Sequence, residues 1–332
     1  MISRIRVIAL ICVLVAATTS MSSCQADNVR QHSKSETSNS QTTVETYPFY
    51  LDILIACDLQ GKVLPCKCGD ASLLRCGIHG MQALIGKLRA ERANLLAIST
   101  GSNLFQYDTP GKTEVNEYLL KELPVCFDFI NLSAWDSLAA YDSNAELPLA
   151  FPLAGGGIDL APVESSFLVK ELSEKKILVL GLSVPDSSLI SGLIRENGFQ
   201  PIDITVEAEK LARKLTEESP EFIFVISNLP GNSVTRFLDL LGRPVDLMVA
   251  DVSVPFSYLD SQIIPLPQGG WKNALLVEMQ NAPGNPRCLF VRKSSVINVP
   301  GVEYFSELHD AAFDNILMSL EENDALGEFK SR

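Results

Sequence analysis

Short apolar segments of strand length alternate with amphipathic segments of helix length, and this order constrains the fold more than any other feature of the chain. The expected strands are 50–57, 93–100, 127–133, 175–184, 221–229 and 245–253. The expected helices are 77–92, 116–123, 205–219 and 233–242. Strands that alternate with helices form parallel βαβ units, in which helices cover the faces of the sheet. The sequence therefore predicts an α/β fold.

Three further apolar segments follow this alternation, and no helical segment separates them. They are 261–268, 274–280 and 287–298, and together they predict an antiparallel sheet that closes the domain. A final amphipathic helix is expected at 307–323. The hydrophobic content of 46% is enough to fill a sizeable core. We therefore expect a single folded domain over residues 47–327.

The N-terminus has the features of an export signal. Arg4 and Arg6 precede an apolar stretch that is too short to span a bilayer as a stable helix, and "MSSC" ends the segment. These last residues resemble the lipobox of bacterial lipoproteins, which implies a signal peptide at 1–23 and an acylated Cys24. Simple secretory cleavage and an uncleaved anchor are the alternatives. The lipid would attach the protein to a membrane of the bacterial cell envelope, facing the periplasm or the exterior.

The segment 24–46 is rich in Ser, Thr, Asn and Gln and has no apolar periodicity, so we expect a disordered tether. The formal net charge of the chain is −13, and no basic stripe offsets it. This charge argues against a nucleic-acid partner.

Polar residues follow five of the expected strands. These strand ends are Cys57-Asp58, Gly101-Ser102, 131–136, Ser227-Asn228 and 251–254. In open α/β sheets the loops at the carboxyl ends of the strands converge on a crevice, where sites are found. We therefore expect any site to lie where these five ends meet.

The five strand ends, in this order, resemble the motif series of the calcineurin-like metallophosphoesterases, in particular the N-terminal domain of bacterial 5′-nucleotidases. The family motifs are Asp-x-His-Gly followed by a proline, Gly-Asp, Gly-Asn-His-Glu, a histidine at a strand end, and Gly-His-x-His. The residues at these places are Asp58, Gln60, Gly61 and Pro65, then Gly101 and Ser102, then Ser133, Ala134, Trp135 and Asp136, then Asn228, and finally Val252 and Val254. The resemblance implies a four-layer α/β/β/α sandwich.

Most metal ligands of that family are missing. Hydrolysis by two metal ions needs oxygen and imidazole ligands around ions about 3.5–4 Å apart. Asp58 alone is retained, and it could equally cap the turn that follows its strand. Asp136 and Asn228 are weak catalytic candidates, and Asp136 with Trp135 would more simply fill the vacated pocket. The sequence therefore predicts a scaffold that does not hydrolyse phosphoesters.

Four cysteines lie within twenty residues, in a loop that resembles the Pro-Cys-x-Cys loop of exported relatives of the 5′-nucleotidase domain. They are Cys57, Cys66, Cys68 and Cys76. Two disulfides are one interpretation, natural in an oxidising compartment. A four-thiolate zinc or iron site is a second. Thiol or redox chemistry is a third, because Cys76 opens a helix whose dipole lowers a thiol pKa.

These observations lead to one functional hypothesis and two alternatives. The hypothesis is an exported lipoprotein with a degenerate metallophosphoesterase fold, whose cysteine loop serves a binding, metal or thiol-redox role with an envelope protein or redox partner. One alternative is a divergent metal-dependent phosphoesterase that uses Asp58, Asp136 and cysteine thiolates. The other is a structural envelope protein stapled by disulfides.

Overall fold

The computed structural model describes two six-stranded sheets, a small two-stranded ladder and four long helices. The described residues are 48–57, 65–66, 75–104, 112–133, 136, 139, 153–154, 167–183, 192, 195–196, 203–267, 273–282 and 285–299. No helix among them is long and apolar enough to cross a membrane. The predictions for the signal peptide, Cys24 and the tether lie outside the described residues.

The first sheet combines a parallel centre with an antiparallel hairpin at one side. Its strands are β1 (Tyr50–Ala56), β4 (Leu95–Ser99), β5 (Phe129–Asn131), β6 (Leu153–Ala154), β13 (Asn273–Ala282) and β14 (Asn285–Asn298). The spatial order is β14-β13-β1-β4-β5-β6. The strands β1, β4, β5 and β6 run parallel, and β13 pairs antiparallel with both β1 and β14.

The second sheet has four parallel strands between two antiparallel edges. Its strands are β7 (Phe167–Leu172), β8 (Lys175–Leu182), β9 (Phe222–Pro230), β10 (Leu247–Asp251), β11 (Phe256–Tyr258) and β12 (Ser261–Pro265). Their order is β11-β12-β10-β9-β8-β7, with β7 and β11 antiparallel to their neighbours. A separate ladder joins β2 (Pro65–Cys66) to β3 (Arg75–Cys76).

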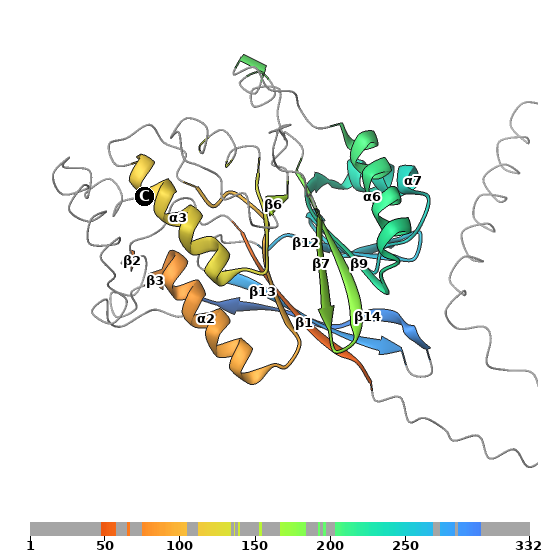
Figure 1. Cartoon of the computed structure of the whole chain (residues 1–332), viewed down its shortest axis with the longest axis horizontal. Helices are drawn as coiled ribbons and strands as arrows, with labels where there is room; N and C mark the ends of the chain where they lie inside the picture. Colours follow the sequence, from red (N-terminus) through yellow and green to blue (C-terminus); the bar gives the residue numbers. More distant parts are fainter. Residues whose placement is uncertain are drawn as a thin grey trace, which may run out of the picture. The chain divides into compact units, whose positions relative to one another are not determined.

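Four helices cover the outer faces of the two sheets (Figure 1). They are α2 (Gly77–Glu91), α3 (Lys112–Cys126), α6 (Ile204–Glu218) and α7 (Gly231–Leu241). Capping residues set the two ends of α6. The Asp203 carboxylate accepts a hydrogen bond from the Thr205 N–H at its start, and Ser219 takes the left-handed conformation at its end.

Three hydrophobic cores separate four layers, which confirms the predicted α/β/β/α sandwich. Residues of β1 alternate between two of these cores. Leu51, Ile53 and Ile55 pack between the sheets, whereas Leu54 and Ala56 pack against the side covered by α2 and α3. The third core lies between the second sheet and helices α6 and α7.

The predicted closing sheet of three consecutive antiparallel strands is wrong in one respect. The strands β13 and β14 do form an antiparallel hairpin, but β12 lies parallel to β10 in the second sheet. The short β11 turns back through Leu259 and Asp260, both at positive φ, so that β12 reaches the open side of β10. There Ile263 and Ile264 are buried on opposite faces of the sheet. The predicted helix at 307–323 lies outside the described residues.

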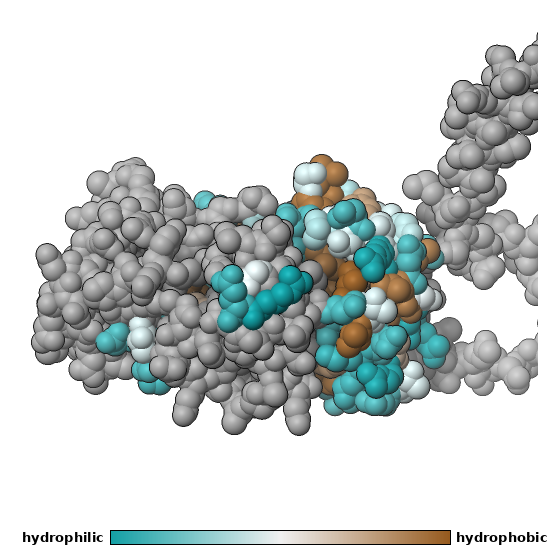
Figure 2. Space-filling model, turned by 90° about the horizontal axis from the view of Figure 1, so that it is seen from above, coloured by the Kyte–Doolittle hydropathy of each residue, from teal (hydrophilic) through white to brown (hydrophobic). Residues whose placement is uncertain are grey.

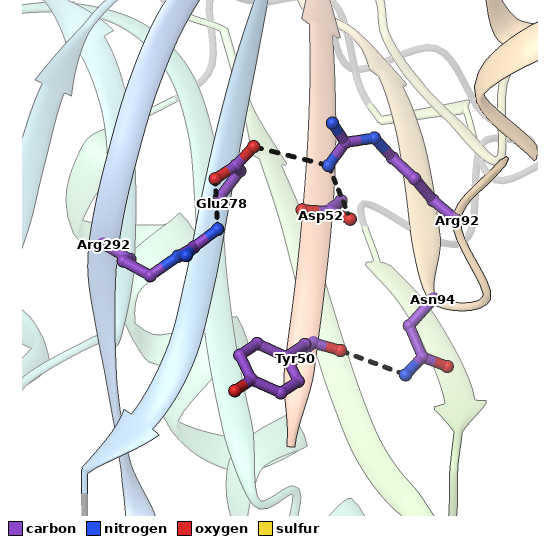
Figure 3. Close-up of polar contacts among 6 residues, drawn as sticks. All are labelled: Tyr50, Asp52, Arg92, Asn94, Glu278 and Arg292. Atoms are coloured by element: carbon purple, nitrogen blue, oxygen red, sulfur yellow. Dashed lines mark hydrogen bonds and ion pairs between the residues drawn. The ribbon is translucent and has the colours of Figure 1, made fainter. Parts of the chain in front are cut away.

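An ion-pair network joins the neighbouring strands β1, β13 and β14 to Arg92, the residue that follows α2 (Figure 3). Arg92 Nη1 lies 2.9 Å from Asp52 Oδ2 and 3.5 Å from Glu278 Oε1, and Glu278 also pairs with Arg292. Asn94 donates a hydrogen bond to the Tyr50 carbonyl group. The side chains are partly exposed, so each pair contributes at most about 1 kcal/mol. The network adds side-chain links to the backbone pairing of β1 with β13.

The exposed apolar side chains are distributed over several elements. Val206 of α6 and Leu240 of α7 are two of them. In the face drawn in Figure 2, hydrophobic residues lie among hydrophilic ones. Apolar residues scattered in this way are normal for a protein surface.

The stability of the second sheet is expected to depend on pH through Asp246. Its carboxylate accepts a hydrogen bond from the Ile223 N–H, and burial raises its pKa from 3.8 to about 6. The folded state therefore binds more protons than the unfolded state between pH 4 and 6, so the free energy of unfolding falls as pH rises through that range. The difference corresponds to at most about 3 kcal/mol.

Urea unfolding of the wild-type chain and of Asp246→Asn at several pH values measures this effect. The asparagine keeps an oxygen that can accept from Ile223 and has no titrating group. The wild-type chain should lose stability relative to the variant between pH 4 and 6. Parallel pH profiles would contradict the assignment.

Candidate functional site

The ends of β4 and β5 are in close contact at the carboxyl edge of the first sheet. Gly101 follows β4 with φ of 108°, and a Cβ at this position would lie 2.8 Å from the Ser133 nitrogen and 2.9 Å from the Asn131 carbonyl oxygen. Both the backbone conformation and the close approach require glycine. The contact brings together the second and third strand ends predicted from the sequence.

Ser102 holds an unusual backbone conformation at the centre of this contact. Its φ is 55°, a left-handed value that residues other than glycine rarely adopt. The Ser102 N–H donates a hydrogen bond to Ser133 Oγ at 3.2 Å. A serine at this place supplies no carboxylate that could bridge two metal ions.

Asp136 is fully buried, and both of its carboxylate oxygens accept hydrogen bonds. Oδ1 accepts from the N–H groups of Asn103 and Leu104 at 2.7 and 2.8 Å. Oδ2 accepts from the Ser133 N–H and hydroxyl groups at 2.9 and 3.0 Å. Burial raises the pKa of this carboxyl group, and the hydrogen bonds oppose that effect. The carboxylate therefore ties the loop after β4 to the loop after β5.

The second sheet brings the other two predicted strand ends to its carboxyl edge. Asn228 is partly exposed near the end of β9, where the neighbouring Ser227 hydroxyl donates to the Val249 carbonyl group at 3.1 Å. At the fifth motif, Val252 is partly buried and Val254 is 63% exposed. Neither valine can bind a metal ion.

Two side-chain amides at the strand ends were not anticipated from the sequence. Asn103 Oδ1 accepts from the Ser99 hydroxyl group at 2.9 Å, and Asn131 Oδ1 accepts from the Ser183 hydroxyl group at 3.2 Å. The second contact joins the two sheets, because Ser183 follows β8. The signal available in the sequence was an asparagine near the end of each apolar strand, because Asn131 is the last residue of β5 and Asn103 follows the end of β4 by four residues.

The cysteine loop is described only in part. The Cys57 thiol donates a hydrogen bond to the Pro267 carbonyl oxygen at 3.2 Å. The backbone register pairs Cys66 with Arg75 and Pro65 with Cys76, which places Cys66 and Cys76 one position apart in the ladder. Asp58, Trp135 and Cys68 lie outside the described residues, as do the side chains of Cys66 and Cys76. The part of the chain that the structure describes contains no group of three or more His, Cys, Asp or Glu that could hold a metal ion.

A partly buried chain of polar side chains lies between α2 and α3, after the cysteine loop in sequence. Gln82 Nε2 donates to Glu122 Oε2 at 2.6 Å, so the Gln82 amide oxygen faces His79 Nδ1 at 3.2 Å. An amide oxygen only accepts, so Nδ1 carries the proton. In the neutral ring Nε2 then accepts from the Tyr118 hydroxyl group, 3.3 Å away. The spacing of residues in the sequence did not indicate this chain.

Cys126 is expected to be inert toward thiol reagents, as befits a core cysteine. It is buried at the end of α3 and donates to the Glu122 carbonyl oxygen at 3.2 Å. Burial raises the pKa of its thiol to about 12, which leaves about a thousandfold less thiolate than an ordinary cysteine at neutral pH. Iodoacetamide labelling at pH 8, followed by mass spectrometry of the Cys126 peptide, should show modification only after unfolding in urea. Prompt labelling of the folded chain would contradict this assignment.

The two helix-covered sheets, with the loops at their carboxyl ends, define the fold of the calcineurin-like phosphoesterases and 5′-nucleotidases. A 5′-nucleotidase precursor from Thermus thermophilus matches with TM-score 0.57 and 14% identity, over 84% of this chain and 60% of that one. The NAD nucleotidase of Haemophilus influenzae matches with TM-score 0.58 and 12% identity, over 83% and 60%. A calcineurin-like phosphoesterase from Bacillus subtilis matches with TM-score 0.54 and 13% identity, over 85% and 99%.

These similarities establish the fold. The chain spans about three fifths of the length of the two nucleotidases. No protein-family model and no curated protein matches the sequence.

Proposed function

We propose that this chain is an exported lipoprotein that uses a phosphoesterase fold without hydrolysing phosphoesters. In this proposal Cys24 carries the lipid that attaches the protein to a membrane of the cell envelope. The cysteine loop beside the strand ends is its functional surface, with a binding, metal or thiol-redox role toward an envelope protein or redox partner.

The main support for the proposal is the hydrogen bonding of the Asp136 carboxylate. A carboxylate that serves a metal ion needs oxygen lone pairs directed at that ion. Both oxygens of Asp136 instead accept from donors of the chain itself, at 2.7 to 3.0 Å. The neighbouring Ser102 and the valines of the fifth motif supply no replacement ligand.

The cysteine loop is favoured because reactive groups converge near it. The ladder brings Cys66 and Cys76 to adjacent positions, and α2 begins directly after Cys76. The helix N-terminus stabilises a thiolate or another anion. A zinc or iron ion would be held there by Cys66, Cys68 and Cys76 with one further ligand, for which Cys57 is the candidate. Thiolates of this kind suit tetrahedral binding of either metal.

The test combines metal analysis, thiol counting and an activity assay on the full chain, purified from an envelope fraction without chelators. We expect no hydrolysis of bis(p-nitrophenyl) phosphate with added Mn²⁺. Cys66→Ser with Cys68→Ser should change the metal content or the thiol count of the folded protein, and Cys126→Ser serves as the matched control outside the loop.

Manganese-dependent hydrolysis that disappears in Asp58→Ala would overturn the proposal in favour of a divergent phosphoesterase. A protein with no metal and no free thiol in the loop would instead indicate disulfides, and the cysteines would then be structural.

A further inference from the structure

The strand β14 forms one edge of the first sheet, and this edge is covered over only part of its length (Figure 1). Odd-numbered residues of β13 face β1, because the Asn281 N–H donates to the Phe49 carbonyl group. Residues of β14 that pair with odd-numbered residues of β13 therefore direct their backbone N–H and C=O groups outward, away from β13. These residues are Leu289, Val291, Ser294, Val296 and Asn298.

The first part of this edge is closed by a side chain of the second sheet. Gln262 of β12 donates from Nε2 to the Leu289 carbonyl oxygen at 2.9 Å, and its Oε1 accepts from the Val291 N–H at 2.8 Å. A β-bulge follows, in which Arg292 is the extra residue between the pairs made by Val291 and Lys293. Capped backbone groups, bulges and charged side chains all protect a sheet edge from further pairing. This protection ends at Lys293.

The last part of the edge, residues 294–298, lacks such protection among the described residues, and we call it the open edge. No hydrogen bond between described residues reaches the outward backbone groups of Ser294 or Val296. Val296 is 62% exposed. Its pair Leu275 packs between the two sheets, so the Val296 side chain lies on that face of the first sheet. An exposed edge of this kind is a template for a further strand.

Charge indicates which kind of strand suits the open edge. The strand β14 contains Arg287, Arg292 and Lys293 and no acidic residue, although the whole chain has a net charge of −13. Arg292 pairs with Glu278 (Figure 3), and the exposed Lys293 directly precedes the open edge. A second copy of β14 would bring the same positive charges to the contact, which disfavours pairing between two copies. An acidic strand from another protein would instead meet charges of opposite sign.

We propose that the open edge binds an extended acidic segment of a partner protein, which adds to the first sheet as a further strand beside β14. The backbone groups of Ser294 and Val296 form the new ladder. The segment's apolar side chains cover Val296, and its acidic side chains, on the other face, pair with Lys293. Main-chain hydrogen bonds give such binding its affinity, and alternate side chains give it specificity. This inference goes beyond the proposed function and depends on neither the cysteine loop nor the loss of hydrolysis.

The test is a titration of the full chain with a labelled hexapeptide of alternating valine and glutamate, followed by fluorescence anisotropy. We expect saturable binding that weakens as salt is added. N-methylation of the valine amides removes the N–H groups that face β14, so it should weaken binding about tenfold or more. N-methylation of the glutamate amides is the matched control and should have little effect, because those N–H groups face away from β14.

Two variants test the protein side of the contact. Val296→Pro removes an outward N–H and leaves the bonds between β14 and β13 in place, so it should fold and bind about tenfold more weakly or worse. Lys293→Glu should transfer the preference to a hexapeptide of alternating valine and lysine. Lys87→Glu, which makes the same charge change at an exposed residue of α2, is the control and should keep the preference of the wild type. The N-methylated peptides decide the question if Val296→Pro does not fold.

Three results would overturn the inference. One is the absence of saturable binding up to the solubility of the peptide. Another is equal affinity for the two N-methylated peptides, since the attraction would then be one of charge without strand pairing. The third is a dimer in sedimentation equilibrium that Val296→Pro dissociates, because a second copy would then occupy the edge. Manganese-dependent hydrolysis together with intact peptide binding would overturn the proposed function alone.

Discussion

Replacing Gly101 with alanine is expected to lower the free energy of unfolding by about 3 kcal/mol or more. A Cβ would lie 2.8 Å from the Ser133 nitrogen and 2.9 Å from the Asn131 oxygen, which are both backbone atoms. The φ of 108° adds strain for any residue with a side chain. The loops after β4 and β5 would have to separate. Urea unfolding monitored by circular dichroism measures the loss.

Gly86→Ala is the matched control for this prediction. Gly86 lies in α2, and no atom lies within 4 Å of a Cβ added there. Alanine is a better helix former than glycine, so this variant should gain up to about 1 kcal/mol. Equal effects of the two substitutions would refute the close contact at Gly101.

Asp136→Ala is expected to destabilise the protein by about 4 kcal/mol, with a marked fall in melting temperature. The substitution leaves three buried N–H groups, those of Asn103, Leu104 and Ser133, without an acceptor. Asp136→Asn should lose less stability than Asp136→Ala, because one oxygen remains to accept from the Asn103 and Leu104 N–H groups. Thermal and urea unfolding of both variants provide the measurement.

Asp251→Asn is the control for the aspartate series, because Asp251 is exposed at the end of β10. It should leave stability unchanged within about 0.5 kcal/mol. A stable Asp136→Ala protein would show that the carboxylate does not hold the two loops, and the argument that Asp136 is structural would fail.

Most of the fold could be predicted from the sequence because the apolar runs are regular. Strand Leu95–Ser99 is buried over its whole length and strand Phe222–Pro230 over its first six residues, so residues 95–98 and 222–226 are all apolar. The place of β12 could not be predicted, since a short apolar run suits an antiparallel and a parallel neighbour equally well. The deciding feature is the tight turn at Leu259 and Asp260, and it gives little sequence signal because leucine does not favour positive φ.

The sequence predicted where the candidate site lies in the fold, but it did not predict which side chains contact one another there. The strand ends at Gly101 and Asn131 do meet, as the order of the strands implied. The partners of Asp136 and the alignment of His79 with Tyr118 depend on how separate segments approach one another, which motif spacing does not encode. The buried NH₂ groups of Asn103 and Asn131 that have no partner among the described residues could not be predicted from the sequence, because asparagine is common in loops.

The hairpin of β13 and β14 has a consequence for how the chain reaches its native state. The strand β1 begins the described fold and has β13 as one of its two neighbours, and the Phe49 N–H is bonded to Asn281, 232 residues away. A growing chain therefore keeps one edge of β1 open until almost all of the domain has been synthesised. Closure of such a distant contact is slow, and it leaves the partly emerged chain loosely folded. A chain that ends before Asn273 would expose that apolar edge permanently and would be prone to aggregate.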